Sequence, residues 1–380
     1  MSDRLSRDFE RFGGGLPREA AAHIRETYGI DLSARYLGTP IPHPIGKGSG
    51  QLSLNPDQIE RDRAAGLAFV VLKTVIAEDE LGRRSMGAWA VHETRMRVER
   101  RGAADGREGW TVTWKGRGWD RSFEDYLALV RLAGDLTRSG AMLTVPSVKY
   151  HLPRLDEPFR DQEYRYTTAR LAEAWGAGTL PIEKDFSPTL AGDALADERD
   201  RILRWLREVP GRIRSAAGTA PVRLALKLMN ARFGEPFQLE MMAAAAEADA
   251  LVCFNRLWDE EARVAYGGWD LSDRNLRVLR AARAAGTSLP LVGTGDVHSG
   301  RLVLEYARAG CESVALHTFF QLPLGEYPAT AGSRTERALH ALLFHPADGI
   351  VAGMLELERG GVLHRHGGEL RFLDLCSPCP

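Results

Sequence analysis

Short apolar segments recur along most of this chain, and a longer amphipathic segment follows nearly every one of them. The apolar segments lack the polar–apolar alternation of a strand with one wet face, so they are typical of parallel strands buried on both faces. The expected strands span residues 45–52, 68–72, 142–148, 180–186, 222–228, 250–254, 289–293 and 313–316. Eight strand–helix alternations predict an α/β fold, a (β/α)8 TIM barrel rather than an open sheet.

The amphipathic segments carry apolar residues at helical spacing. The expected barrel helices span residues 123–137, 163–175, 197–215, 237–248, 273–285 and 301–309. We expect the whole chain, 1–380, to form one barrel domain with a helical N-terminal extension (1–38) and a C-terminal extension (333–380).

An insertion at 77–120 separates the second expected strand from its helix. Residues 94–99 and 109–114 alternate polar with apolar or aromatic side chains, and a glycine-containing segment at 102–106 joins them. Alternation with such a connection predicts a β-hairpin, which we expect to lie over one mouth of the barrel.

The composition excludes several classes of partner. The chain has 50 Lys and Arg against 51 Asp and Glu, a net charge of −1, which argues against a polybasic nucleic-acid binder. Its apolar runs are far shorter than the ~20 residues that span a bilayer, and its N-terminus lacks the apolar segment of a secretory signal. Four scattered cysteines fit a reducing compartment. We therefore expect a cytoplasmic protein that binds a small-molecule substrate, with no nucleic acid and no membrane.

Lysine is scarce in this sequence, which makes its positions informative. Six of the 50 basic residues are lysine, and five of these six fall in or beside expected strands. Lys73 and Lys227 end very apolar strands, at the edge where parallel barrels place their active sites. A buried ammonium needs an anion or an electron-rich ring nearby, so we expect both residues to be functional. For each lysine a structural alternative remains, namely pairing with a carboxylate such as Glu183 or Asp185.

Two glycine-rich turns follow the first and the seventh expected strands. Gly-Lys-Gly-Ser-Gly at 46–50 has small residues that let a flat ring approach the backbone. Gly-Thr-Gly-Asp-Val at 293–297 lies between a strand and a helix, where barrels often bind phosphate through backbone N–H groups. After the fourth strand, Ser187 precedes Pro188 and is either a general base or a turn residue.

Taken in order, these segments resemble motifs of the dihydroorotate dehydrogenase family, a group of FMN-binding (β/α)8 barrels. The resemblance covers residues 38–325 and rests on the order and spacing of the motifs. The motifs are Pro-Ile-Gly-Lys-Gly-Ser-Gly at 44–50, Val-Leu-Lys-Thr-Val at 71–75, Ser-Met-Gly at 85–87, Glu-Lys-Asp-Phe-Ser-Pro at 183–188, Leu-Ala-Leu-Lys at 224–227, Asn255, Gly-Gly at 267–268, Gly-Thr-Gly-Asp-Val at 293–297 and Thr318.

The resemblance implies a flavoprotein, an FMN-dependent oxidoreductase that acts on CH–CH bonds and forms a homodimer. The catalytic residues that it implies are Ser187, Lys73 and Lys227. The substrate residues that it implies are Arg84, Asp185 and Asn255. The residues implied to bind FMN are Gly48, Ser49, Lys73, Thr74, Lys227, Asn255, Gly268, Gly295, Asp296 and Thr318.

The sequence departs from the family where the family holds its substrate. Ser187 runs directly into Pro188, and Arg84, Asp185 and Thr189 stand where the family has asparagine. A site built to hydrogen-bond a polar ring does not survive the loss of these amides, because its buried partners would be left unpaired. We therefore expect a substrate other than dihydroorotate. The extra lysines, together with His43 and Arg84, indicate a small anionic or carbonyl-bearing molecule.

Two alternatives remain. A flavin-free lyase or aldolase-like enzyme would form a Schiff base through a rim lysine, Lys73, Lys149, Lys184 or Lys227. Asp296 in the phosphate turn favours this alternative, because a carboxylate beside a phosphate is unfavourable unless it points away. The shortened loop after the fourth strand supports a non-catalytic barrel instead. No metal site is expected, because Cys376 and Cys379 form a single pair where zinc and iron–sulfur sites need four ligands.

Overall fold

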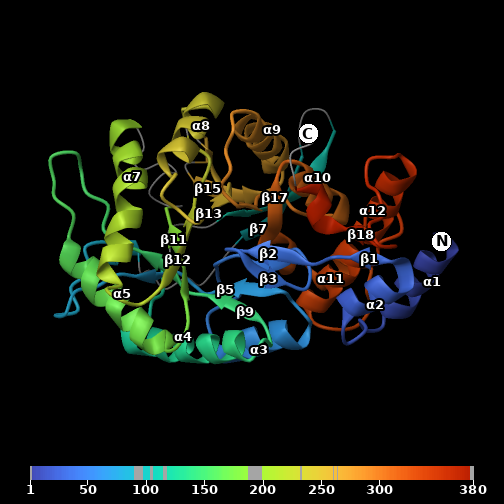
Figure 1. Ribbon diagram of the computed structural model, residues 1–380, viewed down its shortest axis with the longest axis horizontal. Coiled ribbons are helices and arrows are strands. Elements are labelled where there is room, and N and C mark those ends of the chain that lie inside the picture. The colour runs from blue at the N-terminus through green and yellow to red at the C-terminus, as the bar shows by residue number, and fades with distance from the viewer. Residues whose placement is uncertain are drawn as a thin grey trace.

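In the computed structural model, ten parallel strands form one sheet that curls into a barrel-like α/β structure (Figure 1). The structure describes residues 2–89, 97–102, 106–113, 118–186, 199–231, 233–259, 261–262 and 264–376. The strands are β4 (Ile45–Lys47), β5 (Phe69–Val71), β6 (Val75–Ile76), β9 (Leu143–Val145), β10 (Ser147–Lys149), β11 (Leu180–Asp185), β12 (Val222–Lys227), β13 (Ala250–Cys253), β16 (Leu291–Gly293) and β17 (Cys311–Leu316). Their order across the sheet is β6-β10-β11-β12-β13-β16-β17-β4-β5-β9.

The predicted α/β fold with a buried parallel sheet is confirmed, and each predicted strand segment overlaps a strand of this sheet. Burial on both faces explains the apolar sequences: Leu224, Ala225 and Leu226 of β12 are all fully buried. The first strand is shorter than predicted. It ends at Lys47, because the chain turns through the small residues that follow.

Two of the predicted strands are interrupted. The strand at 68–72 resumes after a short break as β6, and Pro146 separates β9 from β10. Proline has no N–H to donate to a ladder, which explains the second break. The two interruptions match each other, because β5 pairs with β9 and β6 pairs with β10.

Helices form a layer outside the sheet (Figure 1). They are α3 (Pro56–Ala64), α4 (Phe123–Arg138), α5 (Asp161–Trp175), α7 (Arg199–Ala216), α8 (Glu235–Ala244), α9 (Leu271–Ala284) and α10 (Gly300–Arg308). All of these except α3 were predicted. Polar side chains fix several starting points: Asn55, Ser122 and Ser299 each accept a hydrogen bond from the first turn of α3, α4 and α10.

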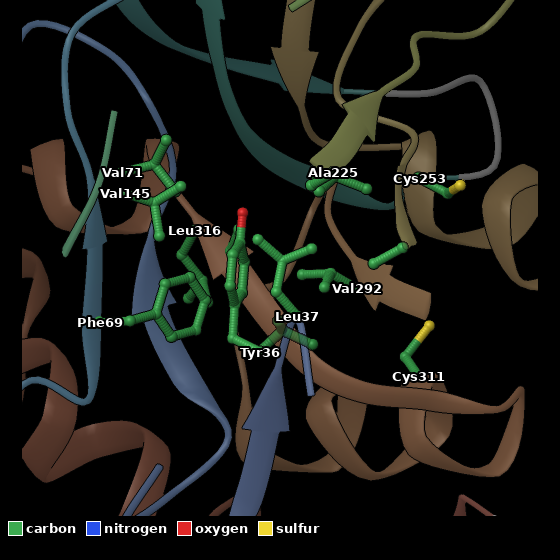
Figure 2. Close-up of a cluster of buried hydrophobic side chains, with 14 of the residues drawn as sticks. Tyr36, Leu37, Phe69, Val71, Val145, Ala225, Cys253, Val292, Cys311 and Leu316 are labelled. Carbon is green, nitrogen blue, oxygen red and sulfur yellow. The ribbon is translucent and has the colours of Figure 1, made fainter. Parts of the chain in front are cut away.

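A short antiparallel pair that the sequence did not predict, β2 (Ala34–Tyr36) with β3 (Thr39–Ile41), packs against the sheet. Leu37 and Gly38 in its turn both have positive φ, a backbone conformation that is unfavourable for a residue such as leucine. Leu37 adopts it with its side chain 97 % buried in the core. The Tyr36 ring lies 4.4 Å from the Phe69 ring. Figure 2 shows Tyr36 with its hydroxyl directed away from the hairpin, toward the interior of the curled sheet.

A second sheet is antiparallel and has four strands in the order β14-β15-β8-β7. These strands are β7 (Arg97–Gly102), β8 (Glu108–Thr113), β14 (Leu257–Asp259) and β15 (Val264–Gly268). β7 and β8 come from the insertion in which the sequence predicts a hairpin, and they pair antiparallel from Arg97↔Thr113 to Gly102↔Glu108. β14 and β15 were not predicted, and they link the insertion to the segment after β13.

The two extensions meet on one side of the molecule (Figure 1). Their helices are α1 (Ser2–Phe12), α2 (Ala20–Tyr28), α11 (Arg334–Phe344) and α12 (Ile350–Arg359). A parallel pair of short strands, β1 (Ile30–Asp31) and β18 (Leu370–Arg371), joins the two extensions. Within the described ranges no helix has both the length and the apolar character needed to cross a membrane.

Candidate active site

A cavity of about 280 Å3 lies at the carboxyl ends of strands of the parallel sheet. The second sheet contributes Trp110 of β8 and Gly268 of β15 to its wall. Its size is close to the lower end of the ~300–1,000 Å3 range of small-molecule sites. Eight of the ten residues predicted to bind FMN line it: Gly48, Ser49, Lys227, Asn255, Gly268, Gly295, Asp296 and Thr318.

Other predicted site residues lie beside the cavity wall rather than in it. Thr74 is buried, and its hydroxyl lies 2.8 Å from that of Ser49. The same hydroxyl lies 3.4 Å from the Asp185 carboxylate, to which it donates in the arrangement where its single hydrogen is not directed to Ser147. Lys73 is 4 % exposed and lies close enough to Lys227 for the two charges to interact.

The structure does not bring Arg84 to the cavity. Its Nε donates to the Glu78 carboxylate at 2.7 Å, and the residue is not part of the cavity wall. The predicted base Ser187 lies outside the described residues, as do Pro188 and Thr189.

A chain of hydrogen bonds crosses the interior of the curled sheet. The Ser49 hydroxyl meets that of Thr74 at 2.8 Å, and Thr74 meets Ser147 at 3.0 Å. Ser147 then donates to one oxygen of the Glu183 carboxylate at 3.2 Å, and the Tyr36 hydroxyl donates to the other at 3.4 Å. The chain therefore connects Ser49 to Glu183, a completely buried carboxylate that also lines the cavity.

Glu183 is also the ionic partner of Lys227. The Lys227 Nζ lies 3.6 Å from the Glu183 Oε1, and the same lysine forms part of the cavity wall. Burial raises the pKa of Glu183, although the charge of Lys227 and the hydrogen bond from Ser147 oppose this effect. Lys227 thus pairs with a carboxylate, as the structural alternative expects, and it also lines the cavity.

Four cationic side chains lie in this region, each buried. Lys73, Lys149, Lys227 and Arg256 are exposed by 2–7 %. Lys149 lies 3.8 Å from the Asp185 carboxylate. Burial, followed by the charge of Arg256, lowers the pKa of Lys73 to about 7. Burial likewise lowers the pKa of Lys149 to about 8, against the opposing effect of Asp185.

Two other lysines, Lys47 and Lys184, have partners inside the protein and not in the cavity. Lys47 forms a buried ion pair with Asp62, and its Nζ donates to the Thr335 hydroxyl at 3.2 Å. Lys184 donates to the backbone carbonyl of Asp185 at 3.1 Å and lies 4.5 Å from the centre of the Phe186 ring. Neither lysine lines the cavity.

The turn after β16 has the geometry of an anion site. Gly295 and Asp296 both have positive φ, +96° and +56°. Within the described residues, the backbone N–H groups at 295–298 donate no hydrogen bond to the protein. A Cβ at Gly295 would lie 2.5 Å from the Asn275 amide nitrogen, so the turn requires glycine at this position.

The carboxylate of Asp296 has partners of its own. The Ser272 hydroxyl donates to its Oδ2 at 2.9 Å, and Nδ1 of His298 lies 3.1 Å from its Oδ1. These contacts hold the carboxylate toward the start of α9 and toward His298.

Sequence reasoning did not single out Arg256 or His317 as site residues. Arg256 directly follows Asn255, but arginine is so common in this chain that residue type carried no signal. His317 directly follows β17 and lines the cavity, and its position at a strand end is the signal that could have found it. Burial and the charges of Lys227 and Lys73 lower its pKa well below the usual value, so the ring is neutral.

A search with models of known protein families and a search of curated protein sequences both found no match to this chain.

Proposed function

We propose that the chain is an FMN-dependent oxidoreductase of the dihydroorotate dehydrogenase-like kind, built on a closed (β/α)8 barrel, whose substrate is a small anionic or carbonyl-bearing molecule other than dihydroorotate. One observation carries the proposal: the turn at 295–298, whose N–H groups have no acceptor in the described part of the chain, and the ammonium of Lys227 line the same cavity at the strand ends. These are the groups that a phosphate and an electron-accepting ring require.

The strand pairing supports a closed barrel. If β5 with β6, and β9 with β10, are each counted as one interrupted strand, the ten strands occupy eight positions. The two ends of the sheet order, β6 and β9, then belong to neighbouring positions, since β5 pairs with β9 and β6 pairs with β10. Every position has two neighbours, as in a barrel.

The turn at 295–298 fits a phosphate. Its N–H groups have no acceptor among the described residues, and they directly precede α10, whose N-terminus favours negative charge. The Asp296 carboxylate opposes an anion, but its contacts with Ser272 and His298 offset part of its charge. Gly295, Asp296 and Thr318 would hold the phosphate, and Gly48, Ser49 and Gly268 would border the ring.

FMN supplies, when bound, a ring that accepts a hydride. Lys227 places a positive charge at the cavity wall, where it favours negative charge on a bound group. Glu183 and Ser147 hold this ammonium in place from inside the sheet. Asn255 gives the wall an amide that can orient a polar ligand.

The substrate would approach from the side of Lys73, Thr74 and Asp185. Ser187, two residues beyond Asp185, is the proposed base that takes a proton from the substrate, and Asp185 is the second choice. The Thr74 hydroxyl and the Lys149 ammonium both lie beside the Asp185 carboxylate. The Lys149 ammonium supports an anionic substrate. Arg84, Asp185 and Thr189 stand where the resembled family has asparagine, and this argues against dihydroorotate.

The absorption spectrum of the purified protein tests the proposal. A band in the visible and near-ultraviolet, followed by release of FMN on denaturation, is the expected result. A colourless protein that also fails to take up added FMN would refute it.

A second candidate function is favoured by Lys73. Its amine is buried, makes no hydrogen bond or ion pair with the described residues, and has a pKa lowered to about 7, so a large fraction is the nucleophilic free amine near neutral pH. Such a lysine suits a Schiff-base lyase or aldolase-like enzyme. Borohydride trapping with carbonyl compounds would label Lys73 if this candidate is correct, and Lys73→Arg would not be labelled.

A further inference from the structure

His298 is the last residue of the turn at 295–298, and it lines the cavity. Its Nδ1 lies 3.0 Å from the backbone carbonyl oxygen of Asp296 and 3.1 Å from the carboxylate of the same residue. A carbonyl and a carboxylate only accept hydrogen bonds, so Nδ1 carries a hydrogen, and this fixes one tautomer of the neutral ring. The other ring nitrogen, Nε2, has no hydrogen-bond partner among the described residues.

The surroundings of His298 favour its protonated form. Burial lowers the pKa of the ring, but the hydrogen bond with Asp296 and the negative charges of Asp296 and Asp348 outweigh burial, so the pKa lies above its ordinary value. Arg301 offsets part of the Asp348 charge, because its Nε lies 3.6 Å from that carboxylate. The side chain of His298 is 55 % exposed, so solvent can supply the proton. The other titratable residues of the described cavity wall are Glu108, Glu183, Lys227, His317 and Glu326.

Protonation of His298 changes two properties of the cavity wall at once. The proton is added at Nε2, which turns from a hydrogen-bond acceptor into a donor. The pair of His298 with Asp296 also changes from a net negative charge to none, which removes the repulsion that the carboxylate exerts on an anion. Both changes favour a phosphate on the N–H groups of the turn. By linkage, a phosphate bound there must in return raise the pKa of the ring.

We propose that His298 is a ligand of the phosphate group and that its protonation controls the affinity of the turn at 295–298 for that group. In the occupied site Nε2–H donates to a phosphate oxygen, while Nδ1–H stays on Asp296. Protein molecules in which the ring is neutral take up one proton from solvent when the phosphate binds. The inference rests on the proposed function in taking this phosphate to be that of FMN, whereas the pair of His298 and Asp296 itself requires only a phosphate.

Fluorescence titrations of the flavin-free protein with FMN and with riboflavin, at about pH 6.5 and about pH 9 and at constant ionic strength, test this proposal. The lower pH stays above the second pKa of a phosphate monoester, about 6. If the phosphate raises the pKa of His298 by about one unit, the ratio of FMN affinity to riboflavin affinity should be about tenfold higher at the lower pH. Riboflavin is the reference for effects of pH on the ring and on the buried lysines. An equal ratio at both pH values would overturn the proposal.

Variants of His298 assign the pH dependence to this ring. His298→Gln cannot be protonated, so its ratio of affinities is expected to change by less than about threefold between the two pH values. His298→Arg is charged at both pH values and is expected to keep tight FMN binding at each, which separates charge from folding. His364→Gln is the matched control, because His364 is exposed and is not part of the cavity wall. Wild-type pH dependence in His298→Gln would overturn the proposal.

Calorimetric titration with inorganic phosphate, in two buffers of different ionisation enthalpy, separates this proposal from the proposed function. Such a pair of titrations measures the protons taken up on binding. A protein that binds FMN more tightly than riboflavin, but with no dependence on His298, refutes the His298 assignment alone. A protein that binds no flavin, but takes up a proton with inorganic phosphate and loses this uptake in His298→Gln, refutes the flavin and leaves the assignment standing. A protein that binds neither FMN nor inorganic phosphate refutes both.

Discussion

Lys227 stands opposite Asp185 in the register of β12 and β11, yet its ammonium pairs with Glu183, 3.6 Å away. Residues two apart on a strand point to the same face, so Glu183, Asp185 and Lys227 all face the interior of the curled sheet. The Asp185 carboxylate instead lies beside the Thr74 hydroxyl and the Lys149 ammonium. Each of the two carboxylates is thus close to a different lysine, Glu183 to Lys227 and Asp185 to Lys149.

Removing Lys227 is expected to destabilise the protein. Lys227→Met leaves Glu183 buried without its cation, and we expect the free energy of unfolding to fall by about 3 kcal/mol in urea titrations. Adding Glu183→Gln to this variant removes the uncompensated carboxylate and is expected to restore part of the loss. A double variant no more stable than Lys227→Met would show that the pair is not coupled.

Lys73 makes stability depend on pH in a defined direction. Its pKa is lowered from 10.5 to about 7, so the unfolded chain binds more protons than the folded one between these values. Stability therefore rises with pH across this window, relative to a variant without the group. Relative to Lys73→Met, the wild type should gain about 3 kcal/mol between about pH 7 and pH 9.5, as measured by urea unfolding at each pH. A constant difference between the two proteins would contradict the lowered pKa.

Gly295 is expected to be essential for both the turn and the cofactor. Gly295→Ala combines a positive φ with a Cβ that would lie 2.6 Å from the Phe254 carbonyl oxygen, so we expect a loss of more than about 2 kcal/mol and no retained FMN. Gly286→Ala is the matched control: its φ is also positive, +88°, but nothing lies within 4 Å of the added Cβ. That variant should lose about 1 kcal/mol and remain yellow. Equal behaviour of the two variants would argue against a tight turn at 295.

Asp296 is expected to weaken FMN binding. Asp296→Gly removes a negative charge beside the proposed phosphate and suits the positive φ at this position. We expect FMN affinity to rise about threefold to tenfold in fluorescence titrations, even though the hydrogen bond from Ser272 is lost. Riboflavin has no phosphate, so its affinity should not change. Weaker FMN binding in this variant would mean that the carboxylate supports the turn more than it repels the ligand.

The parallel sheet could be predicted because its signal is local. Each strand is a continuous apolar run, and its polar exit residue follows within one or two positions, as Lys227 does at the end of β12. Eight of the ten predicted cofactor residues therefore line one cavity, because parallel strands bring their carboxyl ends to the same edge.

Features that depend on distant contacts were missed. Tyr36 meets Glu183 across 147 positions of sequence, and no local pattern records such a contact. The β2–β3 turn places Leu37 at positive φ, where sequence rules expect glycine or asparagine; tertiary packing overrides the local preference. β14 is only three residues long, too short to show a periodicity, and its partner β15 pairs in turn with β8, which is far away in the sequence.

The prediction for Arg84 shows a different limit of what a sequence motif can predict. Its motif matched the resemblance, but the side chain pairs with Glu78 and is not part of the cavity wall. A motif fixes residue types in order, whereas the direction of a long side chain depends on which carboxylate lies within reach.

An equilibrium titration of the flavin-free protein with FMN and with riboflavin, followed by flavin fluorescence, tests the central claim most directly. If the turn at 295–298 binds the phosphate and the cavity binds the ring, FMN should bind at least about a hundredfold more tightly than riboflavin. Equal affinities, or no binding of either compound, would contradict the account.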